Sequence, residues 1–162
     1  MTTTKNNIDK FIDGKEKKSY PSPEKLIPHG SEIRLVDELV YANDKIGVVK
    51  LSLDLKKPYF ENGKFEYTWF IEIMAQGVAC LGGYLESQKA SFSADAVAYI
   101  IAIDRFRILN RLPLNEFDEI FIHVVFDFDL HPAAVYSATA FFEKQELARV
   151  QFKTYIDLRK DL

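Results

Sequence analysis

The chain has 162 residues, a length that fits one domain with a sizeable hydrophobic core. Hydrophobic residues make up 48% of it and charged residues 28%, as in ordinary globular proteins. The net charge of −3 supplies no positive field for nucleic acid or an anionic membrane, so we expect neither as a partner. The single cysteine, Cys80, excludes an internal disulfide. Together with an N-terminus that lacks an apolar signal segment, it predicts a cytoplasmic protein.

The first third of the chain begins with a polar stretch. We expect residues 1–20 to form a flexible tail and residues 21–162 to form a single domain. Ser22-Pro23-Glu24 is typical of a helix start, and Pro28 ends that short helix. Two strands are then predicted, over residues 32–42 and 45–55, with a bulge at Val48-Val49 where the alternation of apolar residues slips by one.

The longest apolar run predicts one buried helix over residues 68–88, preceded by a loop over residues 56–67. Thr68 is the expected N-cap. The helix contains several glycines, each of which costs about 1 kcal/mol relative to alanine. They are understandable if a sheet approaches the helix closely. One face at helical spacing is apolar: Ile73, Met74, Gly77, Val78 and Leu81.

Four more strands follow with short links, over residues 96–109, 119–130, 134–143 and 146–158. A single apolar helix among six largely antiparallel strands predicts an α+β fold in which the sheet wraps around the helix.

Glu72 and Gln76 are polar residues one turn apart on this apolar helix. A carboxylate buried in hydrocarbon is costly unless it is paired or used, and burial would raise the pKa of Glu72 toward that of a neutral-pH acid. The alternative is a glutamate that pairs with a basic residue or reaches solvent. Gln76 either orients Glu72 or bonds the facing backbone.

Three segments carry a family resemblance. Leu26-Ile27-Pro28-His29 is followed by Arg34-Leu35-Val36-Asp37, residues 71–76 read I-E-I-M-A-Q, and residues 103–107 read I-D-R-F-R. This pattern resembles the 3-hydroxyacyl-[acyl carrier protein] dehydratases, and more narrowly their branch in aryl polyene and related pigment pathways. The resemblance covers residues 24–157. It implies the hot-dog fold, a six-stranded largely antiparallel sheet wrapped around one long central helix.

The resemblance also implies an activity. Such an enzyme removes water from a 3-hydroxyacyl thioester of acyl carrier protein or CoA, without a cofactor. Glu72 would be catalytic, and the N-terminus of its helix would donate hydrogen bonds to the thioester oxygen. The family works as a dimer that pairs its sheets edge to edge, so we expect a homodimer or a hot-dog heterodimer. The three histidines are too scattered to predict a metal site.

One departure from the family is clear. Its members carry a catalytic histidine in the loop before the helix, whereas residues 58–66 contain none. His29 is then either a substitute base or a structural turn residue. Three aromatic residues of the loop either line an acyl channel, and so bind substrate with Gln76, or cover the helix end: Tyr59, Phe60 and Phe65. A catalytically silent subunit and an acyl thioesterase remain alternatives.

Overall fold

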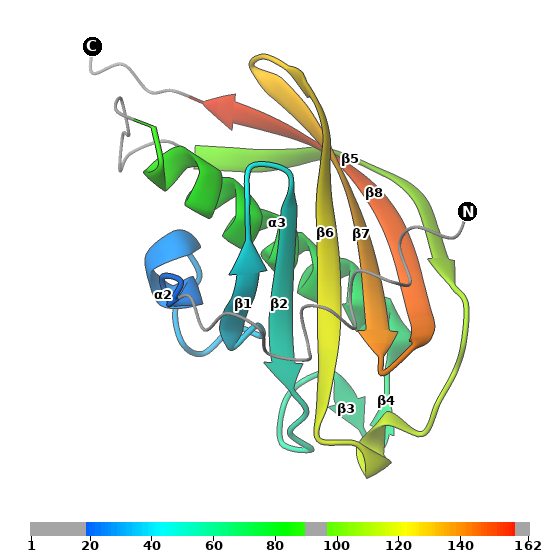
Figure 1. The fold of residues 1–162 in the computed structure, drawn as a ribbon. Coiled ribbons are helices and arrows are strands. Elements are labelled where there is room, and N and C mark those ends of the chain that lie inside the picture. Colours follow the sequence, from blue (N-terminus) through cyan, green and yellow to red (C-terminus); the bar gives the residue numbers. More distant parts are fainter. Residues whose placement is uncertain (1–18, 90–96, 158–162) are drawn as a thin grey trace.

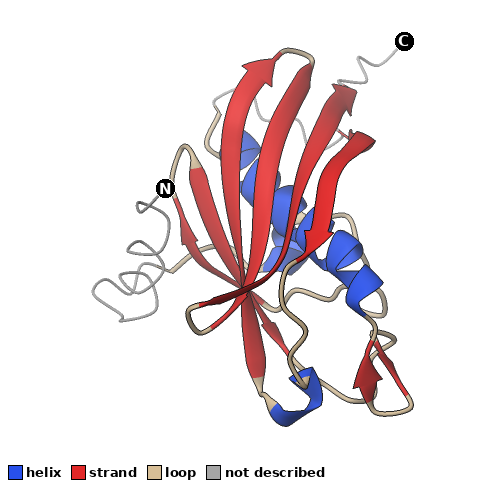
Figure 2. Cartoon of the chain, turned by 90° about the vertical axis from the view of Figure 1, so that its right-hand side faces the viewer, coloured by secondary structure: helices blue, strands red, loops and turns tan. Residues whose placement is uncertain are grey.

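The computed structural model describes residues 19–89 and 97–157. Its main feature is a six-stranded sheet in which all neighbouring strands run antiparallel. The strands lie in the order β1 (Glu38–Ala42), β2 (Ile46–Ser52), β6 (Glu119–Leu130), β7 (Ala133–Phe142), β8 (Gln145–Asp157) and β5 (Val97–Ile108). The sheet curves around one long helix, α3 (Phe70–Ser87), as Figures 1 and 2 show. The α+β hot-dog architecture is therefore as predicted.

Helix α3 packs against the concave face of the sheet through the predicted apolar face. Ile73, Met74 and Leu81 are fully buried. Gly77 lies so close to the sheet that a Cβ there would come within 3.1 Å of Ile122 and 3.2 Å of Val49. Close approach therefore explains this glycine, because even one methyl group would crowd the strands beneath it.

A different contact explains Gly83. A Cβ at this position would lie 2.2 Å from the carbonyl oxygen of Leu26, which belongs to the short helix α2 (Pro23–Leu26). The segment after α2 thus lies beside α3, next to the outer strand β1 (Figure 1). Helix α3 is consequently enclosed on two sides.

The helix start differs from the prediction. Residues Tyr67–Trp69 form a 3-10 turn that leads directly into α3, and the N-cap position is Trp69, without a side-chain hydrogen bond. The predicted cap at Thr68 is wrong, because the 3-10 turn already satisfies the first backbone N–H groups.

Strand β1 is shorter than predicted. It begins at Glu38 rather than at residue 32, since the backbone of residues 33–35 bonds to a side chain of α3 instead of to a strand. The bulge also lies on β1 and not on β2. Leu39 pairs with Val49 and Tyr41 with Val48, so Val40 is the extra residue opposite the predicted position.

The stretch predicted as a loop before α3 contains a small hairpin, β3 (Phe60–Glu61) and β4 (Lys64–Phe65). Asn62 and Gly63 connect its strands with φ angles of 50° and 73°. This left-handed pair is the preferred two-residue hairpin turn. A 3-10 turn, η2 (Leu114–Glu116), lies between β5 and β6.

The two outer strands of the sheet are β1 and β5. Strand β5 exposes several large apolar side chains, which are Tyr99, Ile100, Ile101 and Ile103. Residues 1–18 of the predicted tail lie outside the described part of the chain. Tyr20 makes edge-on ring contacts with Tyr41 and Tyr84. Within residues 19–89 and 97–157, no helix combines the length and apolar character that crossing a bilayer requires.

Candidate active site

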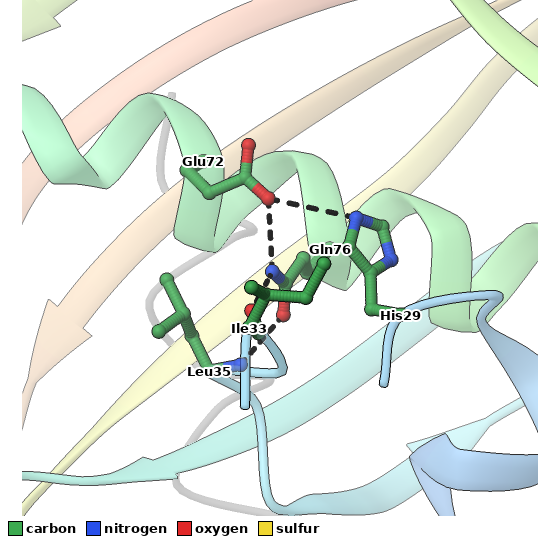
Figure 3. Close-up of polar contacts among 5 residues, drawn as sticks. All are labelled: His29, Ile33, Leu35, Glu72 and Gln76. Atoms are coloured by element: carbon green, nitrogen blue, oxygen red, sulfur yellow. Dashed lines mark hydrogen bonds and ion pairs between the residues drawn. The ribbon is translucent and has the colours of Figure 1, made fainter. Parts of the chain in front are cut away.

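Glu72 lies in the first turn of α3, and His29 lies in the segment between α2 and β1. The fold brings the two side chains together, with His29 Nε2 3.6 Å from Glu72 Oε1 (Figure 3). These are the two residues predicted from the sequence for acid–base chemistry. Both come from the same chain, although they are 43 positions apart.

The segment that carries His29 is held at both ends. Ile27 and Leu35 are buried in the core at 5% and 2% exposure. Between them, the N–H groups of Ile33 and Arg34 donate to the carbonyl oxygen of Gly30 and close a turn. The Arg34 guanidinium donates to the carbonyl oxygen of His29 at 3.5 Å. The imidazole is therefore presented from a folded turn rather than from a loose loop.

Gln76, one helical turn after Glu72, connects this segment to the carboxylate. Its Nε2 donates to Ile33 O and to Glu72 Oε1, both at 2.9 Å, and its Oε1 accepts from Leu35 N–H at 2.7 Å. The side chain is 1% exposed. Both interpretations of Gln76 hold at once, because it orients Glu72 and also bonds the facing backbone.

The burial predicted for Glu72 is not found in the single chain. Its side chain is 45% exposed and that of His29 is 29% exposed. The contacts with His29 and Gln76 are both made by Oε1, and in Figure 3 the other carboxylate oxygen points away from them. One oxygen is thus held by the protein, while the carboxyl group remains accessible to a ligand.

The two ring nitrogens of His29 have different surroundings. Nδ1 is buried and has no hydrogen-bond partner, whereas Nε2 faces the Glu72 oxygen. An acceptor facing Nε2 favours the tautomer with its hydrogen on that nitrogen.

Donation from the helix N-terminus to a thioester oxygen stays a prediction, and two N–H groups at that end have partners within the protein. The N–H of Trp69 donates to Glu66 O, and that of Phe70 donates within the 3-10 turn. Two of the N–H groups just before Glu72 are therefore already used.

The aromatic residues before the helix form a cluster with Phe70. Ring centroids lie 5.5 Å apart for Tyr59 and Phe65, and 5.0 Å apart for Phe65 and Phe70. Tyr59 is fully buried, its hydroxyl donates to Ser52 O, and burial raises its pKa. These contacts favour the covering interpretation for Tyr59 and Phe65. Phe60 is only partly buried, so lining an acyl channel stays a prediction for it.

Other reactive side chains lie elsewhere or are inert. Burial raises the pKa of the Cys80 thiol to about 12, which removes it as a nucleophile at neutral pH. Burial lowers the pKa of His123, which sits in the middle of β6. A hollow lined by residues 19–23 and 37–40 includes neither Glu72 nor His29. The described residues contain no cluster of three or more metal-ligating side chains.

Residues 21–158 match the family model ApeP-like, described as ApeP dehydratase. The chain belongs to the ApeP-like dehydratase family. This match spans the whole described sheet and helix, and includes His29, Glu72 and Gln76. The search of curated proteins found no match.

Solved structures similar to this ApeP-like chain share the hot-dog fold at low sequence identity. The dehydratase heterocomplex ApeI:P from Xenorhabdus doucetiae matches with a TM-score of 0.74 at 14% identity, covering 87% of this chain and 94% of that one. The conserved protein PA5202 from Pseudomonas aeruginosa gives 0.63 at 14% identity, covering 85% and 100%. The thioesterase HI1161 from Haemophilus influenzae gives 0.64 at 8% identity, covering 90% and 96%.

Proposed function

We propose that the protein removes water from a 3-hydroxyacyl thioester, with Glu72 as the acid–base residue and His29 as its partner. The observation that carries the proposal is the 3.6 Å contact between His29 Nε2 and Glu72 Oε1. It supplies an imidazole beside the helix carboxylate although residues 58–66 contain no histidine. Membership of a dehydratase family supports the same reaction class.

The elimination needs one proton removed and one proton delivered. Glu72 takes a proton from the carbon next to the thioester carbonyl. The electrons of that C–H bond form the C=C bond as the C–OH bond breaks. The departing hydroxyl takes the proton from Glu72 and leaves as water, which restores the carboxylate. His29 donates toward Glu72 Oε1 and stabilises its negative charge before and after the reaction.

The substrate class follows from this chemistry and the family. We propose a 3-hydroxyacyl chain carried on acyl carrier protein or CoA, from fatty acid or aryl polyene synthesis. The test supplies purified protein with 3-hydroxyacyl thioesters of several chain types and measures the mass of the acyl group. Loss of one water, abolished in Glu72→Gln, supports the proposal. Release of free thiol without loss of water would instead identify a thioesterase.

We also propose that the protein works as a hot-dog dimer through strand β5. An outer strand offers unpaired backbone groups to another chain, and β5 exposes Ile101 at 59% and Ile103 at 47%. The dehydratase heterocomplex ApeI:P has a similar structure, which favours a second, different hot-dog chain as the partner.

A catalytically silent subunit is the second candidate, favoured by the absence of a histidine from the loop before α3. The distinguishing experiment purifies the native complex and compares Glu72→Gln in this chain with the wild type. Full activity of the mutant complex would assign catalysis to the partner chain. Loss of activity with an intact complex would assign it to Glu72.

A further inference from the structure

The side chain of Gln76 can take only one orientation in this fold. Leu35 N–H is a donor and must face the amide oxygen, whereas Ile33 C=O is an acceptor and must face the amide nitrogen. A flipped amide would place its N–H groups against the Leu35 N–H, and its oxygen against the Ile33 carbonyl oxygen. At 1% exposure, the Gln76 side chain has almost no access to water that could replace either partner. The backbone of residues 33–35 therefore fixes the amide.

The fixed amide leaves one N–H hydrogen, and it points at Glu72 Oε1 at 2.9 Å. His29 Nε2 approaches the same oxygen (Figure 3). A proton on Oε1 would meet the Gln76 N–H, so a proton on the carboxyl is better placed on Oε2. The surroundings of Glu72 thus make its two oxygens chemically different.

We propose that Gln76 is a positioning residue that holds Glu72 Oε1 and thereby makes Oε2 the oxygen that exchanges protons with the substrate. This inference rests on the proposed dehydration and assigns the reacting atom within it. Gln76 also sets the position of His29 relative to Glu72, because it bonds both the segment that carries His29 and the carboxylate. The amide itself does not touch the substrate.

Two variants of Gln76 test the proposal through the pH dependence of kcat/KM. Gln76→Glu keeps the shape and can still accept from Leu35 N–H, but it brings a second carboxylate against Glu72 Oε1. Gln76→Met keeps the length and removes every hydrogen bond. We expect kcat to fall by about 100-fold with little change in KM, since a misplaced group loses mainly reaction geometry. The acidic limb of the kcat/KM profile should shift to a higher pH by about one to two units. The shift should be larger in Gln76→Glu than in Gln76→Met, because a second carboxylate repels the negative charge of Glu72.

Arg34→Met is the matched control, because it loosens the same segment at His29 O without touching Glu72. We expect a lower thermal midpoint but an acidic limb at the wild-type pH. If the two Gln76 variants lower the midpoint and leave the acidic limb in place, Gln76 is only structural and the proposal is wrong. If Glu72→Gln retains dehydration, the proposed function fails first, and the two failures are therefore distinguishable.

A measurement on the wild-type chain covers the case in which a Gln76 variant does not fold. NMR follows the side-chain N–H signals of Gln76 during a pH titration. We expect one of the two signals to move as Glu72 titrates, and not to move in Glu72→Gln. Rapid exchange of both hydrogens with water, or no response to Glu72, would contradict the proposal.

Discussion

Glu72 and His29 meet because the segment after α2 is folded back along α3 and held there by Gln76. His29 is 29% exposed, and a glutamine of similar volume can fill most of the space that its ring occupies. We expect His29→Gln to lower kcat by about 10- to 100-fold, because the Glu72 carboxylate loses a contact to a polar group, with an unchanged thermal midpoint. The assay is the mass of the acyl product. His131→Gln, at an exposed turn, is the control, and equal losses in both variants would contradict the role of His29.

Burial of His123 should make the free energy of unfolding depend on pH. Burial lowers its pKa below 6.5, so the unfolded chain binds a proton at a higher pH than the folded chain does. Stability from this residue is then fully present above about pH 6.5 and falls as the pH drops below it, by at most about 1.4 kcal/mol per pH unit. Urea unfolding between about pH 7 and pH 5 measures the slope. His123→Leu should flatten it, and an equally steep slope in that variant would contradict the assignment.

At the scale of elements, much of the architecture was predictable from the sequence. Strand β6 has the predicted bounds, and β7 begins and ends one residue earlier than predicted. Strand β8 begins one residue earlier and continues to the last described residue, Asp157. Alternation of apolar residues and short polar links marks these strands clearly.

The exceptions have physical causes. Ile33 and Leu35 alternate like strand residues, but they do not pair with a strand. Their backbone groups bond to the side chain of Gln76 on α3 instead. The Asn62-Gly63 dipeptide was a hairpin signal that the loop prediction overlooked.

The candidate site was predictable only in part. Glu72 and Gln76 stood out as polar residues on an apolar helix, and the family motifs drew attention to His29. The contact between His29 and Glu72 depends on how α2 docks on α3, which local patterns do not encode. Glu72 is also more exposed than predicted, because a periodic pattern cannot show which part of a helix surface the rest of the chain leaves uncovered.

The docking of α2 on α3 can be tested through two adjacent glycines. A Cβ at Gly83 would meet the backbone at Leu26 O, whereas a Cβ at Gly82 would meet only Tyr136 Oη at an ordinary 3.6 Å. We expect Gly83→Ala to destabilise the fold by about 1–3 kcal/mol and to reduce activity by shifting the segment that carries His29. Gly82→Ala should be neutral or stabilising by up to about 1 kcal/mol. Urea unfolding compares them, and equal stabilities would contradict this packing.

At the scale of the whole molecule, the exposed apolar side chains of β5 predict assembly. We expect Ile101→Lys to weaken or abolish the dimer, because a charged side chain on an outer strand opposes pairing with another strand. Leu55→Lys is the matched control, since Leu55 is equally exposed, at 60% against 59%, but lies outside β5. Sedimentation of each variant, alone and with its native partner, measures the assembly. A dimer that survives in Ile101→Lys but not in Leu55→Lys would place the interface elsewhere.

The central claim is that Glu72 moves a proton at the carbon next to a thioester carbonyl. Deuterium exchange at that carbon is a sensitive test, because each reversal of the elimination in D2O delivers a deuteron from Glu72 to it. The native complex is incubated with a 3-hydroxyacyl thioester in D2O, and deuterium in the recovered acyl groups is measured by mass spectrometry. We expect deuterium at that carbon with the wild type and almost none with Glu72→Gln. Undiminished deuterium incorporation by the Glu72→Gln complex would contradict it.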